Sequence, residues 1–158
     1  ETIKTPATGS AVNFLTVTNA AANGDVDIAA DGSDTDIDLA LSSKGTGSIV
    51  LSNTMALSTQ TLTGSGAADP KFPLTLTSNS GAFAVSLIGG IRTGQMHKFI
   101  NLLGGVCTIT PASFANGTTV ALAQYAVAEL IWTGPGTNGN WVLTTHATTG
   151  TVPVVTVA

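Results

Sequence analysis

Short runs in which apolar and polar residues alternate follow one another along residues 14–62. A period of two is the pattern of half-buried β-strands, because successive side chains of a strand point to opposite faces of the sheet. Segments rich in Gly, Asn, Ala and Ser separate these runs and have the composition of turns. The pattern predicts strands at 14–18, 25–30, 36–41 and 49–51.

Residues 31–52 predict the hairpin around which this region is organised. One face of its first strand carries Ile37, Leu39 and Leu41, and the other face carries acidic or small residues. The two glycines of the turn at 44–47 adopt positive φ at low cost, and the second strand starts at Ile49. A single hairpin is marginally stable in water, so its apolar face needs a cover. We expect that cover to be either the rest of the chain or the same segment of a neighbouring copy.

Residues 64–73 form the clearest boundary in the sequence, because they contain glycines and two prolines that a central strand does not accept. We therefore predict four parts in chain order. They are a polar N-terminal arm at 1–13, a slender β-hairpin or β-prism segment at 14–63, a linker at 64–73 and a C-terminal domain at 74–158.

The C-terminal part is expected to be a β-sandwich or jelly-roll-like domain, which makes the whole chain all-β. Its strands are longer and more apolar, and we expect them at 74–77, 83–88, 95–103, 106–110, 118–122, 127–133, 140–145 and 152–157. A helix competes only at 121–130, where β-branched surroundings favour a strand pair. Trp132 and Trp141 flank the turn at 134–140, so we expect them to pack on or near one hairpin.

Composition indicates an oligomer. Charged residues make up 9% of the chain and aromatic residues 5%, while the mean hydropathy is positive. No run of about 18 uninterrupted apolar residues is present, so insertion of a helix into a membrane is not expected. The remaining explanation is a protein that buries much of its surface in subunit contacts. The five cations are scattered rather than clustered, which argues against nucleic-acid binding.

The six aspartates between Asp25 and Asp38 are the one candidate for a metal site. Their spacing matches neither an EF-hand loop nor a Gly-rich calcium repeat. In an alternating strand, Asp34 and Asp36 would share a solvent face with Asp38. We expect a solvated acidic face, with a cation at an oligomer axis or a turn as the alternative. No metal and no cofactor is assigned.

No residue of the chain is predicted to be catalytic. Cys107, the one cysteine, lies in an alternating strand and is expected to be a buried, inert thiol. His97 and His146 have no motif around them, and Glu129 has no second carboxylate nearby, so we expect structural roles for all three. The glycine runs at 45–47 and 64–66 lack the lysine and flanking elements of a phosphate loop and are predicted to be turns.

Several short segments of the chain resemble segments of tailed-bacteriophage virion proteins. In the first half they are Phe-Leu-Thr-Val-Thr-Asn-Ala-Ala at 14–21, Gly-Ser-Asp-Thr-Asp-Ile-Asp-Leu at 32–39 and Lys-Gly-Thr-Gly at 44–47. In the second half they are Gly-Gly-Val-Cys-Thr-Ile-Thr-Pro-Ala at 104–112, Asn-Gly-Thr-Thr at 116–119 and Gly-Asn-Trp-Val at 139–142. These segments are similar to β-rich parts of phage fibres and head-decorating proteins. The resemblance implies an exposed, all-β, trimeric protein without catalysis.

We therefore expect a non-enzymatic structural protein that decorates or stabilises the bacteriophage capsid as a homotrimer, in the manner of a cement protein or head fibre. Phage capsid proteins would be its partners, and the virion, at the capsid surface or the tail, its location. The alternative is a tail fibre or receptor-binding tip in which the loop between Trp132 and Trp141 stacks on a host surface glycan. A polysaccharide-degrading enzyme would need a carboxylate pair, and Glu129 stands alone in the C-terminal strands.

Overall fold

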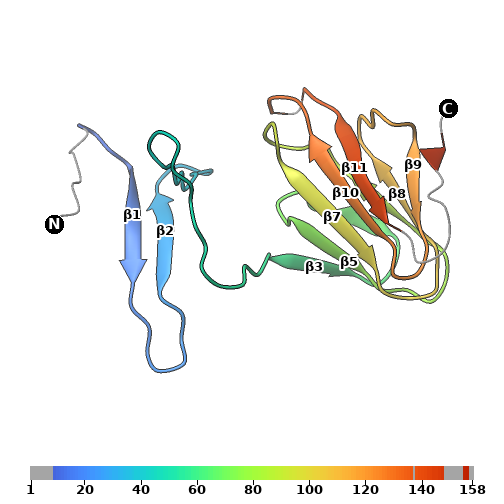
Figure 1. Ribbon diagram of the computed structural model, residues 1–158, viewed down its shortest axis with the longest axis horizontal. Helices are drawn as coiled ribbons and strands as arrows, with labels where there is room; N and C mark the ends of the chain where they lie inside the picture. Colours follow the sequence, from blue (N-terminus) through green and yellow to red (C-terminus); the bar gives the residue numbers. More distant parts are fainter. Residues whose placement is uncertain (1–8, 137, 148–154, 157–158) are drawn as a thin grey trace. The chain divides into compact units, whose positions relative to one another are not determined.

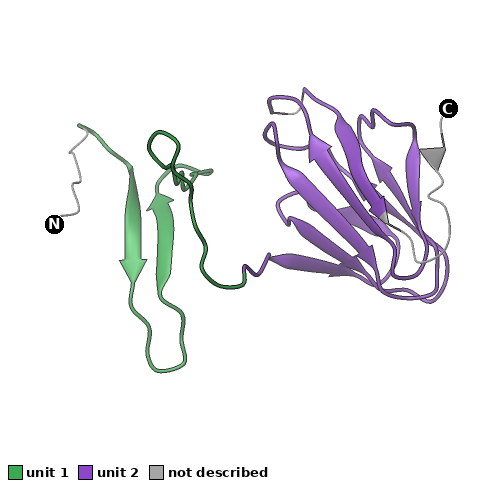
Figure 2. Cartoon of the chain, in the orientation of Figure 1, with its two compact units in different colours: residues 1–54 green, residues 55–158 purple. Residues whose placement is uncertain are grey.

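The computed structural model describes residues 9–136, 138–147 and 155–156. Every regular secondary-structure element among these residues is a β-strand (Figure 1). The all-β prediction is therefore confirmed. The chain divides into two units, one ending at Thr54 (unit 1) and one beginning at Met55 (unit 2) (Figure 2). The first residues of the predicted arm, 1–8, lie outside the described residues.

Unit 1 contains an antiparallel hairpin of β1 (Asn13–Thr18) and β2 (Asp27–Gly32) (Figure 1). Two of the strands predicted from the alternating pattern are therefore confirmed, with bounds that differ by one or two residues. In the register of the hairpin Val17 pairs with Ile28. The connection between the strands turns through Asn23, which has a φ of 68°.

The hairpin predicted for residues 31–52 is not formed, because no described residue of unit 1 beyond Gly32 lies in a strand. Its turn is present, since the Gly47 N–H donates to the Lys44 carbonyl at 3.2 Å. The flanking segments lack a cover: Leu41 is 64% exposed and Val50 is 78% exposed. Two uncovered strands gain too little from burial to offset the entropy lost in ordering their backbone.

Unit 2 contains two five-stranded sheets that share one hydrophobic core (Figure 1). The first sheet has the strand order β11-β10-β7-β5-β3, and the second sheet has the order β12-β9-β8-β6-β4. The strands are β3 (Thr59–Leu62), β4 (Gly66–Ala68), β5 (Leu74–Thr77), β6 (Phe83–Leu87), β7 (Met96–Asn101), β8 (Cys107–Pro111), β9 (Thr119–Leu122), β10 (Val127–Trp132), β11 (Trp141–Ala147) and β12 (Val155–Thr156).

The chain winds between the two sheets before it turns back on itself. Strands β3, β5 and β7 are parallel neighbours in the first sheet, and β4, β6 and β8 are parallel neighbours in the second. Because successive strands alternate between the sheets, residues 59–111 form coils in the way that a β-solenoid is wound. Strands β9, β10 and β11 then pair antiparallel with their neighbours. The alternating pattern, which predicts a β-sandwich or jelly-roll-like domain, does not predict these parallel ladders.

The core lies between the sheets and is built from alternate residues of their strands. Its buried apolar members are Ala68, Phe83, Val85, Leu87, Phe99, Cys107, Ile109, Val120, Leu122, Ala126, Ala128, Leu130, Trp132 and Trp141. Trp132 and Trp141 are opposite each other in the β10–β11 ladder, with ring centroids 5.4 Å apart. Their expected packing on one hairpin is confirmed. A Cβ atom at Gly90 would overlap the ring of Trp132, so this glycine lets the loop backbone rest on the indole.

The structure divides the chain after Thr54, whereas the sequence predicts the linker at 64–73. The segment 64–73 contains β4, and the Ala68 side chain is only 1% exposed. Gly66 therefore begins a short strand, and Gly64 lies in the bend before it. Glycine and proline mark chain reversals, and whether a reversal joins two domains or two strands of one coil depends on the contacts around it.

The strands predicted for 74–145 are confirmed, since each of them overlaps one of β5 to β11. The segment 121–130 forms the end of β9 and the start of β10 rather than a helix. The strand predicted at 152–157 lies partly outside the described residues, and its described part pairs with β9.

A fragment of residues 55–158 is expected to fold without unit 1, because the whole described core lies within it. Its thermal unfolding, followed by Trp fluorescence, should be cooperative, with a midpoint close to that of the same transition in the full chain. Residues 1–54 alone should give the circular dichroism spectrum of an unfolded peptide, since a lone hairpin is marginal in water. A fragment 55–158 that unfolds without a cooperative transition would contradict this division.

Candidate interaction surface

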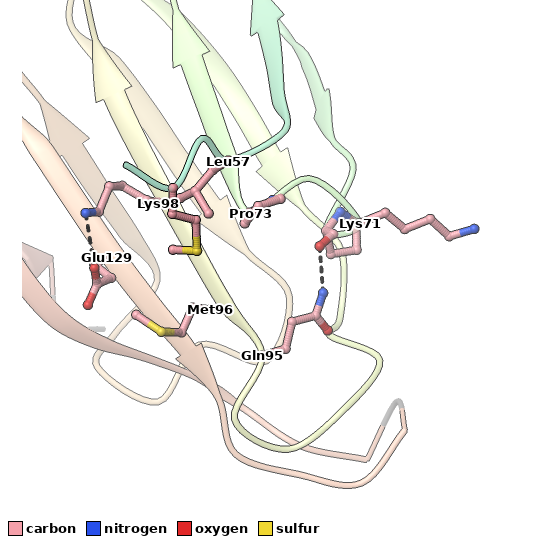
Figure 3. A pocket seen from close by; sticks show the side chains of 9 residues that line it. Leu57, Lys71, Pro73, Gln95, Met96, Lys98 and Glu129 are labelled. Atoms are coloured by element: carbon pink, nitrogen blue, oxygen red, sulfur yellow. Dashed lines mark hydrogen bonds and ion pairs between the residues drawn. The ribbon is translucent and has the colours of Figure 1, made fainter. Parts of the chain in front are cut away.

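A pocket of about 510 Å³ opens on the outer side of the first sheet in unit 2 (Figure 3). Met96 and Lys98 of β7 and Glu129 of β10 line it, and their side chains face away from the core because they alternate with buried residues. Met55 and Leu57, which precede β3, line it as well, together with the loop that leads into β5. The pocket therefore lies where the chain that enters unit 2 passes over the sheet.

Lys98, Glu129 and Gln95 in the lining of the pocket are paired within the chain. Lys98 Nζ lies 3.4 Å from Glu129 Oε2, and the Thr144 hydroxyl donates to Glu129 Oε1 at 3.3 Å. The side-chain amide of Gln95 donates to the Pro70 carbonyl at 2.6 Å (Figure 3). The pocket holds one carboxylate, already in an ion pair, and so lacks the acid pair of a glycosidase. Its lining suits an apolar side chain.

Trp132 and Trp141, which are expected to stack on a glycan in the receptor-binding alternative, are both fully buried. The indole N–H of Trp132 donates to the Gly136 carbonyl, and that of Trp141 donates to the Ile88 carbonyl, each at 2.8 Å. Neither ring face is open to a ligand in this fold. The structure places both residues in the core rather than at a binding site.

His97 ends a buried polar row that crosses the first sheet. Its Nε2 lies 2.8 Å from Thr75 Oγ1, and the side-chain amide of Gln60 donates to the same hydroxyl at 2.8 Å. Burial lowers the pKa of His97 from 6.5 to about 4, and the charge of Asp69 opposes that shift only in part. The imidazole is therefore neutral at physiological pH, in keeping with the structural role expected for it.

The other single reactive groups are also held within unit 2. Cys107 is fully buried, and this burial raises the pKa of its thiol to about 11. The thiol therefore stays protonated at physiological pH, which agrees with the inert thiol expected from the sequence. His146 is half-buried on β11, and burial lowers its pKa. The structure does not bring His97, His146 and Glu129 together into one site.

The acidic cluster is exposed, although no strand aligns Asp34, Asp36 and Asp38. All six aspartates from Asp25 to Asp38 are exposed, and Asp34 accepts a hydrogen bond from Asn13 Nδ2 at 2.7 Å. Among the residues that the structure describes, no group of three His, Cys, Asp or Glu side chains is arranged to hold a metal ion. The solvated state expected for these carboxylates agrees with their exposure.

Sequence reasoning did not anticipate the pocket or the polar row. Met55 and Leu57 are far from Met96 and Lys98 along the chain, and only the pairing of the strands brings them to one place. The alternating pattern around Thr75 predicts a strand, but it does not say which of its two faces is inside.

The chain matches no protein-family model, and no curated protein matches it either. In the part of the chain that the structure describes, no helix has the length and apolar character needed to cross a membrane.

We predict that unit 2 loses stability as the pH falls from about 6.5 to about 4. Within this window His97 takes up a proton in the unfolded chain but remains neutral in the fold, so protons favour unfolding. Replacing His97 with Gln should shrink the loss of unfolding free energy between pH 7.5 and 4.5 by about 2–3 kcal/mol. Urea unfolding followed by Trp fluorescence measures this, since both tryptophans lie in unit 2.

His146→Gln is the matched control for this measurement, because its pKa is lowered in the same direction at a half-buried site. It should remove a smaller part of the acid sensitivity. A His97→Gln variant as sensitive to acid as the wild-type chain would show that His97 does not titrate in the way its burial requires.

Proposed function

We propose that this chain is a non-enzymatic structural subunit that assembles with copies of itself, as a homotrimer that decorates or stabilises a bacteriophage capsid. One observation carries the proposal: no residue from Gly9 to Ala67 is buried, although this stretch is rich in apolar side chains. Those more than half exposed are Phe14, Leu15, Val17, Val26, Ile28, Leu41, Ile49, Val50, Leu51 and Met55.

Isolated exposed apolar residues are ordinary, but a stretch of this length without a core is not. Burying one Val, Leu, Ile or Phe side chain contributes about 1.5–3 kcal/mol, so covering this set would supply much of the stability that unit 1 lacks alone. Every copy of the chain carries the same uncovered apolar segments. Mutual coverage in a closed, symmetric assembly satisfies all copies with one arrangement.

The virion location rests on the resemblance of the segments 14–21, 32–39 and 104–112 to phage fibre and head-decorating proteins. A segment that gains order only in an assembly, followed by a unit with its own core, suits a fibre or cap on a particle surface. Phage capsid proteins are the partners that this role requires. The absence of catalysis is supported by the burial of His97 and Cys107 and by the pairing of Glu129 with Lys98.

The receptor-binding alternative loses the two residues on which it was based, because Trp132 and Trp141 are enclosed in the core. A host glycan would have to be bound by other residues of the chain. The capsid role does not depend on either ring.

Light scattering after size-exclusion chromatography tests the assembly directly. The full chain should elute with the mass of a trimer, and the mass should persist on dilution because the interface includes the otherwise uncovered apolar segments. A monomer at all concentrations would overturn the proposal, since the exposed set would then have no cover.

Deleting residues 1–13 tests the attachment to the capsid. We expect the shortened chain to keep its oligomeric mass and the cooperative unfolding of unit 2, because neither unit 2 nor most of the exposed set is removed. It should no longer sediment with purified heads that lack the protein, since terminal arms of this kind become ordered against a partner. Undiminished binding would mean that another part of the chain is the anchor.

A further inference from the structure

The two sheets of unit 2 differ in the side chains that they present outward. Along β6, β8 and β9 of the second sheet the outward residues are small or carry hydroxyl groups: Ala84, Ser86, Thr108, Thr110, Thr119 and Ala121. Along β5, β7 and β10 of the first sheet most of them are large and apolar: Leu74, Leu76, Met96, Ile100, Val127 and Ile131. Only the outward face of the second sheet has the composition of a face exposed to water.

The outward apolar residues of the first sheet form continuous rows across its strands. Leu76 of β5 is paired with Ile100 of β7, which is paired with Val127 of β10. On the other side of the Lys98–Glu129 pair, Met96 is opposite Ile131. Neighbours in such rows contact one another, and most of these side chains are half-buried, while Met96 at the pocket is 48% exposed.

The charges on this face do not prevent its burial. Glu129 uses both carboxylate oxygens within the chain, one toward Lys98 and one toward the Thr144 hydroxyl. Burying an ion pair that already has its partners costs less than burying a lone charge. An apolar face whose charges form one ion pair within the chain fits the apolar centre of an interface between identical subunits.

We propose that the outer face of the first sheet, with the pocket at Met96, is a docking surface for a second copy of this chain. The inference rests on the proposed assembly and adds to it the surface through which unit 2 takes part. In this arrangement unit 2 contributes its own contacts between the subunits of the oligomer.

Two observations select a second copy as the occupant. First, Met55 and Leu57 in the pocket follow the uncovered segment 49–51 in the chain, and the four peptide links from Leu51 to Met55 span at most about 14 Å. The uncovered segment and the pocket are therefore close along the chain, which favours their coverage by one neighbouring copy. Second, Lys71 adds a positive charge to the pocket lining beyond the Lys98–Glu129 pair, while six of the nine acids of the chain lie between Asp25 and Asp38. This charge distribution attracts unit 1 of another copy to the pocket.

A glycan is a poorer fit to the same pocket. Sugar sites use an aromatic face for stacking and unpaired polar groups for hydrogen bonds. The lining of this pocket contains no aromatic residue, and Glu129 and Gln95 are already bonded within the chain.

The test uses the full chain and two matched substitutions, Met96→Glu in the pocket and Ser86→Glu on the outward face of the second sheet. A glutamate at position 96 would place a further charge in the apolar centre of the docked interface, so self-association should weaken by roughly tenfold or more. Ser86→Glu should leave it unchanged. Light scattering over a dilution series measures both, and far-UV circular dichroism with Trp fluorescence checks that unit 2 remains folded.

A photo-crosslinking amino acid placed at position 96 in the otherwise native chain gives a second measurement that does not depend on weakening the assembly. Irradiation should produce covalently linked copies of the chain, with the crosslinked peptides identified by mass spectrometry, whereas the same group at position 86 should not. If the chain is an oligomer, but Met96→Glu keeps its mass and position 96 yields no linked copies, the docking surface is refuted and the proposed assembly stands. A chain that is monomeric throughout overturns both.

Discussion

An apolar side chain needs a facing layer to leave water, and among the described residues the fully buried ones lie in the space between the two sheets of unit 2. The tilted pair of Trp132 and Trp141 occupies it, and Gly90 allows a loop to close over one of the rings. Everything outside that space follows from the same constraint. Unit 1 keeps its apolar residues exposed because it has one hairpin and no facing sheet, and this is why we propose that other copies supply the second layer.

The first sheet has an unusual distribution of polarity that connects its interior with its outer face. Thr75 and Thr77 of β5 are buried, while the leucines between them point outward. The inward hydroxyls have partners, because Thr75 bonds to His97 and Thr77 donates to Asn101. Asn101 in turn donates to the carbonyls of Gly105 and Leu122. The hydroxyls of Thr75 and Thr77 are therefore hydrogen-bonded inside the unit, although the buried Nδ1 of His97 has no partner, and the two leucines of the strand lie on its outer face.

Much of the fold was predictable, and the candidate surface was not. The alternating pattern located β1, β2 and β5 to β11 because it depends only on successive side chains along one strand. The same pattern predicted strands at 36–41 and 49–51, which do not form without a cover. The pocket joins residues 55–57 to residues 96–98, and no local pattern carries that contact. The tryptophans were correctly paired with each other, yet their burial removes them from the surface.

The sequence by itself determined the class of structure, the positions of most strands and the turn between the two tryptophans, because period-two alternation and glycine-rich turns act over a few residues. Tertiary structure alone decided three things: the parallel winding of β3 to β8, the end of unit 1 at Thr54 and the face of β5 that is inside. The physical reason is that these depend on which strands pair. Pairing is settled by burial summed over residues far apart in the chain, and either face of an alternating strand can be turned inward.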